Sequence, residues 1–243
     1  MVYEFLRTSP RYDQVAQLSI DYNVDLVVQH VNPDESLQRG LSANDSWQLA
    51  RICPRPLLLV KGRDWHEFPV LITVVDPMSG YHSDMRSDSA ILKLAIQAKA
   101  QLHGKLHMVH AYSESSWPFT NSASLKIKHK KALLKMLAPY CIDSESVHLV
   151  DKTPLYALLQ YKENLKPDII IMDTVSRSRF TEAILGNPTK RVLDYLQTDL
   201  LIIKQGYVLE KSRNRISRDT SPNYLGGKRV YATAAQKFNV VEN

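Results

Sequence analysis

Glycine, cysteine and long apolar runs are scarce in this sequence. It has only 8 glycines and 2 cysteines among 243 residues, and no apolar run approaches the roughly 18 residues of a membrane-spanning helix. A phosphate-binding backbone loop needs close approach and positive φ angles that residues with a Cβ avoid. The shortage of glycine therefore argues against a glycine-rich cradle for a triphosphate.

The two cysteines, Cys53 and Cys141, lack the paired Cys or His spacing of a zinc site. Cys53 is predicted to be a small core residue, because free cysteine is among the most buried residue types. The N-terminus shows no basic region followed by an apolar core, so the expected location is cytoplasmic.

Recognisable catalytic motifs are also missing, since the sequence has no Gly-x-Ser-x-Gly elbow and no Walker loop. We therefore predict that the protein is not an enzyme. His103, His107 and His110 suggest a metal site, but His107 and His110 are three apart on an expected strand and so point to opposite faces. Packed or surface histidines are the better interpretation, and no metal is predicted.

The net charge of +6 lies mostly in the last 39 residues, where seven Lys or Arg and three Asp or Glu give +4. Residues 205–243 are therefore expected to be a basic, disordered tail. Because the rest of the chain carries only +2, binding to nucleic acid is not predicted.

The most structured stretch of the sequence is residues 165–204. Two short apolar runs, Ile169–Met172 and Leu200–Ile203, are typical of buried parallel strands. Between them, Asn187 can cap a helix that has Pro188 at its first position. The stretch is predicted to be a strand, a loop, a helix and a strand, and the start of that helix can hold an anion.

The same pattern occurs earlier in the chain. A shift of 143 positions, the separation of Asp25 and Asp168, places residues 24–61 over residues 167–204 without a gap. Asn44 then aligns with Asn187, and the apolar runs align with each other. Several matches in one register indicate an internal duplication.

The remaining segments alternate between expected strands and helices. Strands are predicted at residues 2–5, 68–75, 106–112 and 147–150, and helices at residues 11–22, 88–102, 124–137 and 154–161. Ser87 or Asp88 is the expected cap of one helix, and Gly104 its expected C-terminal glycine. The fold class is therefore α/β, with a doubly wound, open, parallel five-stranded sheet and a partial second copy.

This arrangement resembles the universal stress proteins, in particular the tandem type E branch. The resemblance rests on a first strand ending at Asp76, on the Leu-Gly-Asn sequence at residues 185–187, and on Arg-Ile-Cys-Pro-Arg-Pro-Leu-Leu-Leu-Val-Lys at residues 51–61. It implies that residues 1–63 are the incomplete, C-terminal part of a first domain, which is truncated at the N-terminus. Residues 66–204 are then a complete second domain.

The resemblance also implies an adenine-nucleotide-hydrolase-like sheet of order 3-2-1-4-5 and a cytoplasmic, stress-related role without an established reaction. It implies pairing between the last strands of the two domains, here Leu57–Lys61 and Leu200–Lys204. Protein partners or self-association through these strands are expected. No membrane partner is expected.

In nucleotide-binding relatives, the first-strand aspartate faces the adenosine part and a glycine loop holds the phosphates. Asp76 matches the first feature, whereas the loop glycines fall on Asp173, Ser176 and Arg179, and only Gly186 remains. The candidate nucleotide-binding residues are Asp76, Val109, Asp173, Thr174, Ser176, Arg177, Arg179, Gly186, Asn187 and Thr189.

Two interpretations of the loop stay open. Arg177 and Arg179 can contact phosphate through their guanidinium groups, or they can form a solvated basic loop. Three hypotheses on function follow: a non-enzymatic stress protein acting through ligand or protein binding, an ATP-binding member with slow ATPase activity, and a non-functional relic of a longer gene.

Overall fold

The computed structural model describes residues 11–31, 42–78, 86–113, 122–173 and 197–204. In chain order its elements are α1 (Arg11–Asp21), β1 (Val27–His30), α3 (Ser42–Ile52), β2 (Leu57–Val60), β3 (Val70–Val74), α4 (Arg86–Gln101), β4 (Lys105–Tyr112), α5 (Ser122–Leu137), η3 (Ser144–Ser146), β5 (Val147–Asp151), α6 (Pro154–Leu165), β6 (Ile169–Asp173) and β7 (Asp199–Ile203). None of the helices in these ranges is long and apolar enough to cross a membrane.

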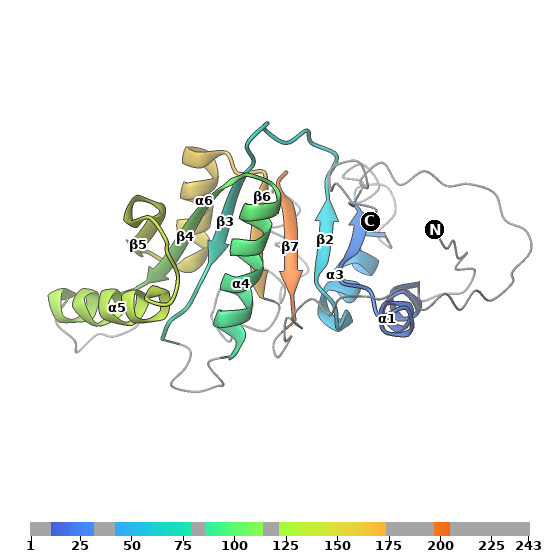
Figure 1. Cartoon of the computed structure of the whole chain (residues 1–243), viewed down its shortest axis with the longest axis horizontal. Coiled ribbons are helices and arrows are strands. Elements are labelled where there is room, and N and C mark those ends of the chain that lie inside the picture. The colour runs from blue at the N-terminus through green and yellow to red at the C-terminus, as the bar shows by residue number, and fades with distance from the viewer. Residues whose placement is uncertain (1–10, 32–41, 79–85, 114–121, 174–196, 205–243) are drawn as a thin grey trace, which may run out of the picture.

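The strands form one seven-stranded sheet in the order β1-β2-β7-β6-β3-β4-β5 (Figure 1). All neighbouring strands are parallel except β2 and β7, which are antiparallel. The predicted α/β class with a mostly parallel sheet is confirmed. The two strands nearest the N-terminus, β1 and β2, do not form a separate sheet, because β2 pairs with β7.

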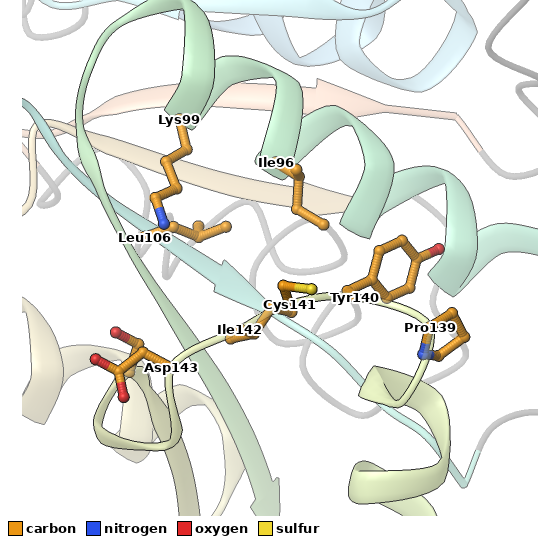
Figure 2. Close-up of a pocket in the computed structure, with 9 residues that line it drawn as sticks. Ile96, Lys99, Leu106, Pro139, Tyr140, Cys141, Ile142 and Asp143 are labelled. Carbon is orange, nitrogen blue, oxygen red and sulfur yellow. The ribbon is translucent and has the colours of Figure 1, made fainter.

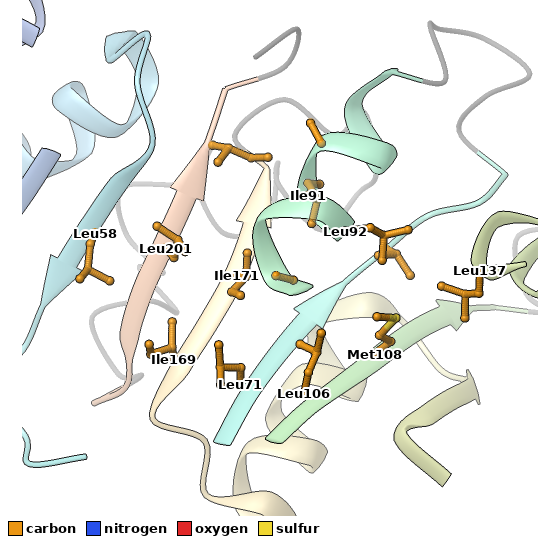
Figure 3. Close-up of a cluster of buried hydrophobic side chains, with 14 of the residues drawn as sticks. Leu58, Leu71, Ile91, Leu92, Leu106, Met108, Leu137, Ile169, Ile171 and Leu201 are labelled. Atoms are coloured by element: carbon orange, nitrogen blue, oxygen red, sulfur yellow. The ribbon is translucent and has the colours of Figure 1, made fainter. Parts of the chain in front are cut away.

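The core has one layer on each face of the sheet. On one face, α1, α3 and α6 pack against side chains such as Leu57, Ile170 and Leu200. On the other, α4 packs over a cluster that includes Leu58, Ile171 and Leu201, and Leu137 of α5 joins it beside Met108 of β4 (Figure 3). Because both faces are covered, the central strands are continuous apolar runs, as the sequence predicted.

The strand pairs on the two sides of the β2–β7 contact have the same register. Val27 pairs with Leu57 in one, and Ile170 pairs with Leu200 in the other, so each equivalent residue lies 143 positions further along. At the contact itself, Leu58 pairs with Leu201, and the shift of 143 positions also makes Leu201 the equivalent of Leu58. A local twofold axis therefore passes through this leucine pair and relates the two strand pairs.

Two buried aspartates hold the connector that joins the related parts. Asp199, 1% exposed, accepts hydrogen bonds from the Lys61 N–H at 2.7 Å and from the Trp65 Nε1–H at 2.8 Å. Asp168, 7% exposed, accepts from the His66 and Val70 N–H groups at 3.2 and 2.8 Å. The His66 ring nitrogen Nδ1 also lies 2.9 Å from Asp168 Oδ2. The connector is thus attached to the starts of β6 and β7.

The starts of three helices can be compared with the sequence. Thr153 caps α6, with its side chain accepting from the Tyr156 N–H. Ser87 and Asp88 are not caps, because α4 already begins at Arg86. Asn44, which aligns with Asn187 under the shift of 143 positions, lies inside α3, which begins at Ser42.

Gly104 was expected to end α4 with a left-handed conformation, but His103 adopts it instead, with φ of 51°. Glycine is required at position 104 for a different reason. A Cβ there would lie 2.4 Å from the Pro69 carbonyl oxygen, closer than any contact allows. The absence of a side chain lets the end of α4 approach the segment before β3.

Several predictions lie outside the described residues. They are the strand at residues 2–5, the helix beginning at Asn187 and the tail at residues 205–243. The division into residues 1–63 and 66–204 also stays a prediction.

Replacing Asp199 by Ala should destabilise the fold by about 2 to 4 kcal/mol, because two partly buried N–H donors, of Lys61 and Trp65, lose their acceptor. The measurement is urea unfolding followed by circular dichroism. Asp64→Ala is the matched control, since Asp64 is an exposed residue of the same connector. A loss below about 0.5 kcal/mol for Asp199→Ala would contradict the proposed role of Asp199.

Candidate functional site

The candidate site lies at the carboxyl end of β3, where the strand order reverses. β3 has β4 on one side and β6 on the other, so the connection from β3 to β4 and the connection from β6 to β7 run in opposite directions along the sheet. In doubly wound sheets ligands bind at such a point, beyond the carboxyl ends of the strands. Asp76 follows β3 there, and Asp173 ends the neighbouring β6.

Asp76 is half-buried and held in a short turn. Its Oδ1 accepts a hydrogen bond from the Met78 N–H at 3.1 Å. The residue before it is fixed as well, because the Val75 N–H donates to the Val109 carbonyl oxygen at 3.1 Å. The turn therefore holds the Asp76 carboxylate in a defined place at the end of the strand.

Val109 has a structural role in this arrangement. Its side chain is 1% exposed and belongs to the core beneath α6, and its carbonyl oxygen is bonded to Val75. Neither group is presented toward the carboxyl ends of the strands. A contact between Val109 and a ligand stays a prediction.

Asp173 is the one predicted loop residue within the described part of the chain. The backbone of Asp173 pairs with Ile203 at the end of β6. The other predicted site residues lie outside the described part of the chain: Thr174, Ser176, Arg177, Arg179, Gly186, Asn187 and Thr189. Their contribution to an anion site stays a prediction.

A buried histidine pair lies behind the Asp76 turn. His110 Nδ1 is 3.1 Å from the Val75 carbonyl oxygen, and His110 Nε2 is 2.8 Å from His129 Nδ1. A carbonyl oxygen only accepts, so in a neutral ring the proton of His110 is on Nδ1. His110 Nε2 then accepts from the His129 Nδ1–H, which assigns both tautomers.

This assignment leaves the lone pair of His129 Nε2 without a donor, and that nitrogen is buried without a hydrogen-bond partner. Burial lowers the pKa of His110 to about 4, against a smaller raising effect of the Val75 carbonyl. The pKa of His129 is also lowered to about 4, mainly by burial and then by His110, while the Asp76 carboxylate raises it slightly. Both rings are therefore neutral at pH 7.

The sequence carries one signal for the burial of His129. Leu125, His129, Leu133 and Leu137 repeat every four residues along α5, and all four are buried. A histidine in such an apolar row is expected to face the core. Its partner on β4, 19 positions earlier, cannot be identified without knowing how α5 packs on the sheet.

The second histidine pair lies on the opposite face of β4. His107 Nδ1 is 3.1 Å from His148 Nε2, and the His148 ring packs against Tyr161 with centroids 4.5 Å apart. Burial lowers the pKa of both imidazoles. His107 and His110 thus point to opposite faces, as predicted, and the described residues contain no group of three or more metal-ligating side chains.

A small pocket lies near the start of β4, at the amino ends of the strands, whereas Asp76 lies at their carboxyl ends. It has a volume of about 270 Å³, and its walls include Ile96, Leu106 and Tyr140, with Lys99 and Cys141 beside them (Figure 2). Cys141 is an exposed free thiol, whereas Cys53 is buried, as predicted. Burial raises the pKa of the Cys53 thiol, so this residue is protonated in the core.

His129→Gln should make the free energy of unfolding less dependent on pH. The folded-state pKa of about 4 is below the ordinary value of 6.5, so the unfolded chain binds the extra proton first. Stability is therefore full above pH 6.5 and falls as the pH drops toward 4. Unfolding in urea at pH 4.5 to 7.5 should show a shallower slope for the variant, by at most about one proton.

His30→Gln is the control for this prediction, since His30 is exposed on β1. An unchanged slope for His129→Gln would show that His129 is not a buried neutral base.

Comparison with known proteins identifies the family. The model of the universal stress protein family matches residues 70–204. Universal stress protein E of Salmonella typhi is 26% identical over 206 residues, which are 79% of this chain and 65% of that protein. The Haemophilus influenzae homologue is 26% identical over 195 residues, 75% and 62% of the two chains. This chain therefore matches slightly less than two thirds of the length of these relatives.

Solved structures show the same fold. A putative universal stress protein from Pseudomonas aeruginosa UCBPP-PA14 superposes with a TM-score of 0.61 at 21% identity, over 82% of this chain and 69% of that one. A universal stress protein from Archaeoglobus fulgidus gives a TM-score of 0.54 at 17% identity, over 83% and 68%. With the family match over more than half of its length, the chain belongs to the universal stress protein family.

Proposed function

We propose that this protein is a non-enzymatic component of a stress response that acts by binding a ligand or a partner protein at the carboxyl ends of the strands, beside Asp76. The observation that carries the proposal is the position of Asp76 at the carboxyl end of β3, where the strand order reverses. Family membership supports the stress-related role. A cytoplasmic location is part of the same proposal.

The negative charge of the Asp76 carboxylate favours a ligand with hydroxyl or amino groups. A carboxylate accepts hydrogen bonds from such donors, whereas it repels an anion. A phosphate group would therefore need compensation by the guanidinium groups of Arg177 and Arg179, which the sequence places in the following loop. Since only Gly186 remains of the glycines expected in that loop, we do not propose a backbone cradle.

The histidines near Asp76 support binding over catalysis. His110 uses one ring nitrogen on Val75 and the other on His129. The remaining nitrogen, His129 Nε2, is buried. A general base must reach the proton that it abstracts, and neither ring offers an accessible nitrogen. Their role in this proposal is to support the turn that carries Asp76.

A second candidate function is ATP binding with slow hydrolysis. It is favoured by Asp76, which matches the position of the aspartate that faces adenosine in nucleotide-binding relatives. This function needs the two arginines to replace the phosphate loop, so it predicts that both Asp76 and the arginines contribute to affinity.

Calorimetry with ATP and Mg²⁺, together with an assay for released phosphate, separates the two functions. The non-enzymatic proposal predicts no phosphate release above the background, and no micromolar ATP binding. Micromolar binding that falls at least about tenfold in Asp76→Ala, accompanied by phosphate release, would contradict it and support the second function.

Two variants make this experiment specific. Asp143→Ala is the matched control. Asp143 is an exposed aspartate at η3, and it lines the pocket near the amino end of β4, away from Asp76. The double variant Arg177→Ala, Arg179→Ala tests whether guanidinium groups hold the phosphates. Unchanged ATP affinity in the double variant would exclude the arginine-based form of the second function.

A further inference from the structure

Helix α5 carries charge of one sign only. Its sequence contains neither aspartate nor glutamate, and its five lysines are all exposed: Lys126, Lys128, Lys130, Lys131 and Lys135. Lysines on a helix surface are commonly paired with acidic residues three or four positions away, and α5 contains no acidic residue for such pairs. The outer side of α5 is therefore a concentrated positive surface.

Two apolar side chains lie along the middle of this surface. Ile127 is 67% exposed and Leu134 is 55% exposed. They are seven positions apart, which is close to two turns of helix, so they form one row along the axis. This apolar row lies on the side of α5 away from the residues that are buried against the sheet.

Lysines border the apolar row on both sides. Lys130 and Lys131 each lie three or four positions from Ile127 and from Leu134, and the helical repeat places them on opposite sides of the row. A helix with exposed apolar residues between lysines is suited to an anionic membrane surface. The apolar side chains enter the headgroup region, and the long lysine stems carry the ammonium groups to the lipid phosphates.

Other occupants fit this surface less well. A partner helix needs apolar anchors at i, at i+3 or i+4, and at i+7, but the middle positions between Ile127 and Leu134 are lysines. Nucleic acid would use the lysines and leave the apolar row in water. The tail of this chain, residues 205–243, is itself basic, so its charge does not complement α5.

The position of α5 in the fold leaves its outer side available for such a contact. It connects β4 and β5, which lie at the opposite end of the sheet from β1, and Figure 1 shows it at the end of the molecule away from α1. Its buried side chains hold it on the sheet, so the outer side can be used without unfolding the helix.

We propose that the outer side of α5 binds the surface of an anionic lipid bilayer, with Ile127 and Leu134 in the headgroup region and the lysines at the lipid phosphates. This goes beyond the proposed function, because it uses a surface other than the position beside Asp76. It also differs from the expectation of no membrane partner, since a surface contact needs no membrane-spanning segment. With only two apolar side chains inserted, the binding is weak and reversible.

The experiment is sedimentation of the full chain with lipid vesicles. Vesicles of phosphatidylcholine with about 30% phosphatidylglycerol should bind the protein at about 50 mM NaCl, whereas vesicles of phosphatidylcholine alone should not. Raising the salt to about 500 mM should release the protein, because it screens the lysines from the lipid phosphates.

The double variant Lys130→Gln, Lys131→Gln should lower the affinity for anionic vesicles about 30-fold, since each lysine near such a surface contributes about fivefold. The matched control is Lys105→Gln, Lys152→Gln, which removes the same charge from exposed positions outside α5. The control should bind the vesicles like the original protein. Circular dichroism and urea unfolding check that each variant is folded.

The double variant Ile127→Gln, Leu134→Gln keeps every charge and tests the apolar row. Its affinity for anionic vesicles should fall at least about fivefold, because two apolar side chains no longer leave water. Its affinity for heparin should not change, since heparin offers negative charge without an apolar interior.

Absence of binding to anionic vesicles would overturn the proposal. So would binding that both α5 variants leave intact, which would assign it to the basic tail, or binding that the control variant weakens as much as the lysine variant does. Vesicle binding that is unchanged in the apolar variant would indicate a general site for polyanions such as nucleic acid, and would also overturn the proposal.

Discussion

The antiparallel contact between β2 and β7 is the constraint on which the rest of the structure depends. It joins two strand pairs, β1–β2 and β6–β7, and the strands within each pair are parallel. The contact lies on a local twofold axis between Leu58 and Leu201. Without it, β1 and β2 would be an isolated two-stranded sheet, which is marginally stable at best in water. With it, these strands share the core of the complete doubly wound unit.

Buried polar groups make this contact specific. Apolar strands of similar sequence can slip in register, because leucine and isoleucine pack in many ways. Asp168 and Asp199 restrict the choice, since each binds backbone or side-chain donors of the connector between β2 and β3. The connector thereby determines where β3 begins, and so where Asp76 lies at the other end of that strand.

Much of this could be predicted from the sequence. The buried strands were recognisable as apolar runs, and the shift of 143 positions gave the relation between the two strand pairs. The roles of the two aspartates were not predicted, because their partners lie 98 to 138 positions away in the chain. Gly104 was assigned to a helix cap for a similar reason, since only the fold brings Pro69 next to it.

The candidate site was predicted less completely than the fold. Asp76 follows directly from the position at which an apolar strand ends, which is a local property. The pairing of His110 with His129 depends on how α5 packs on β4, and one sequence does not give that packing. Local pattern therefore predicted the position of Asp76 at the end of its strand, whereas the histidine pair behind it required the tertiary structure.

The most direct test of the twofold contact is nuclear Overhauser spectroscopy on a deuterated sample with labelled leucine and isoleucine. An antiparallel contact predicts cross-peaks between Leu58 and Leu201, and symmetrically between Leu57 and Ile202 and between Leu59 and Leu200. Cross-peaks that instead join Leu57 to Leu200 and Leu59 to Ile202 would mean a parallel contact and would contradict this account.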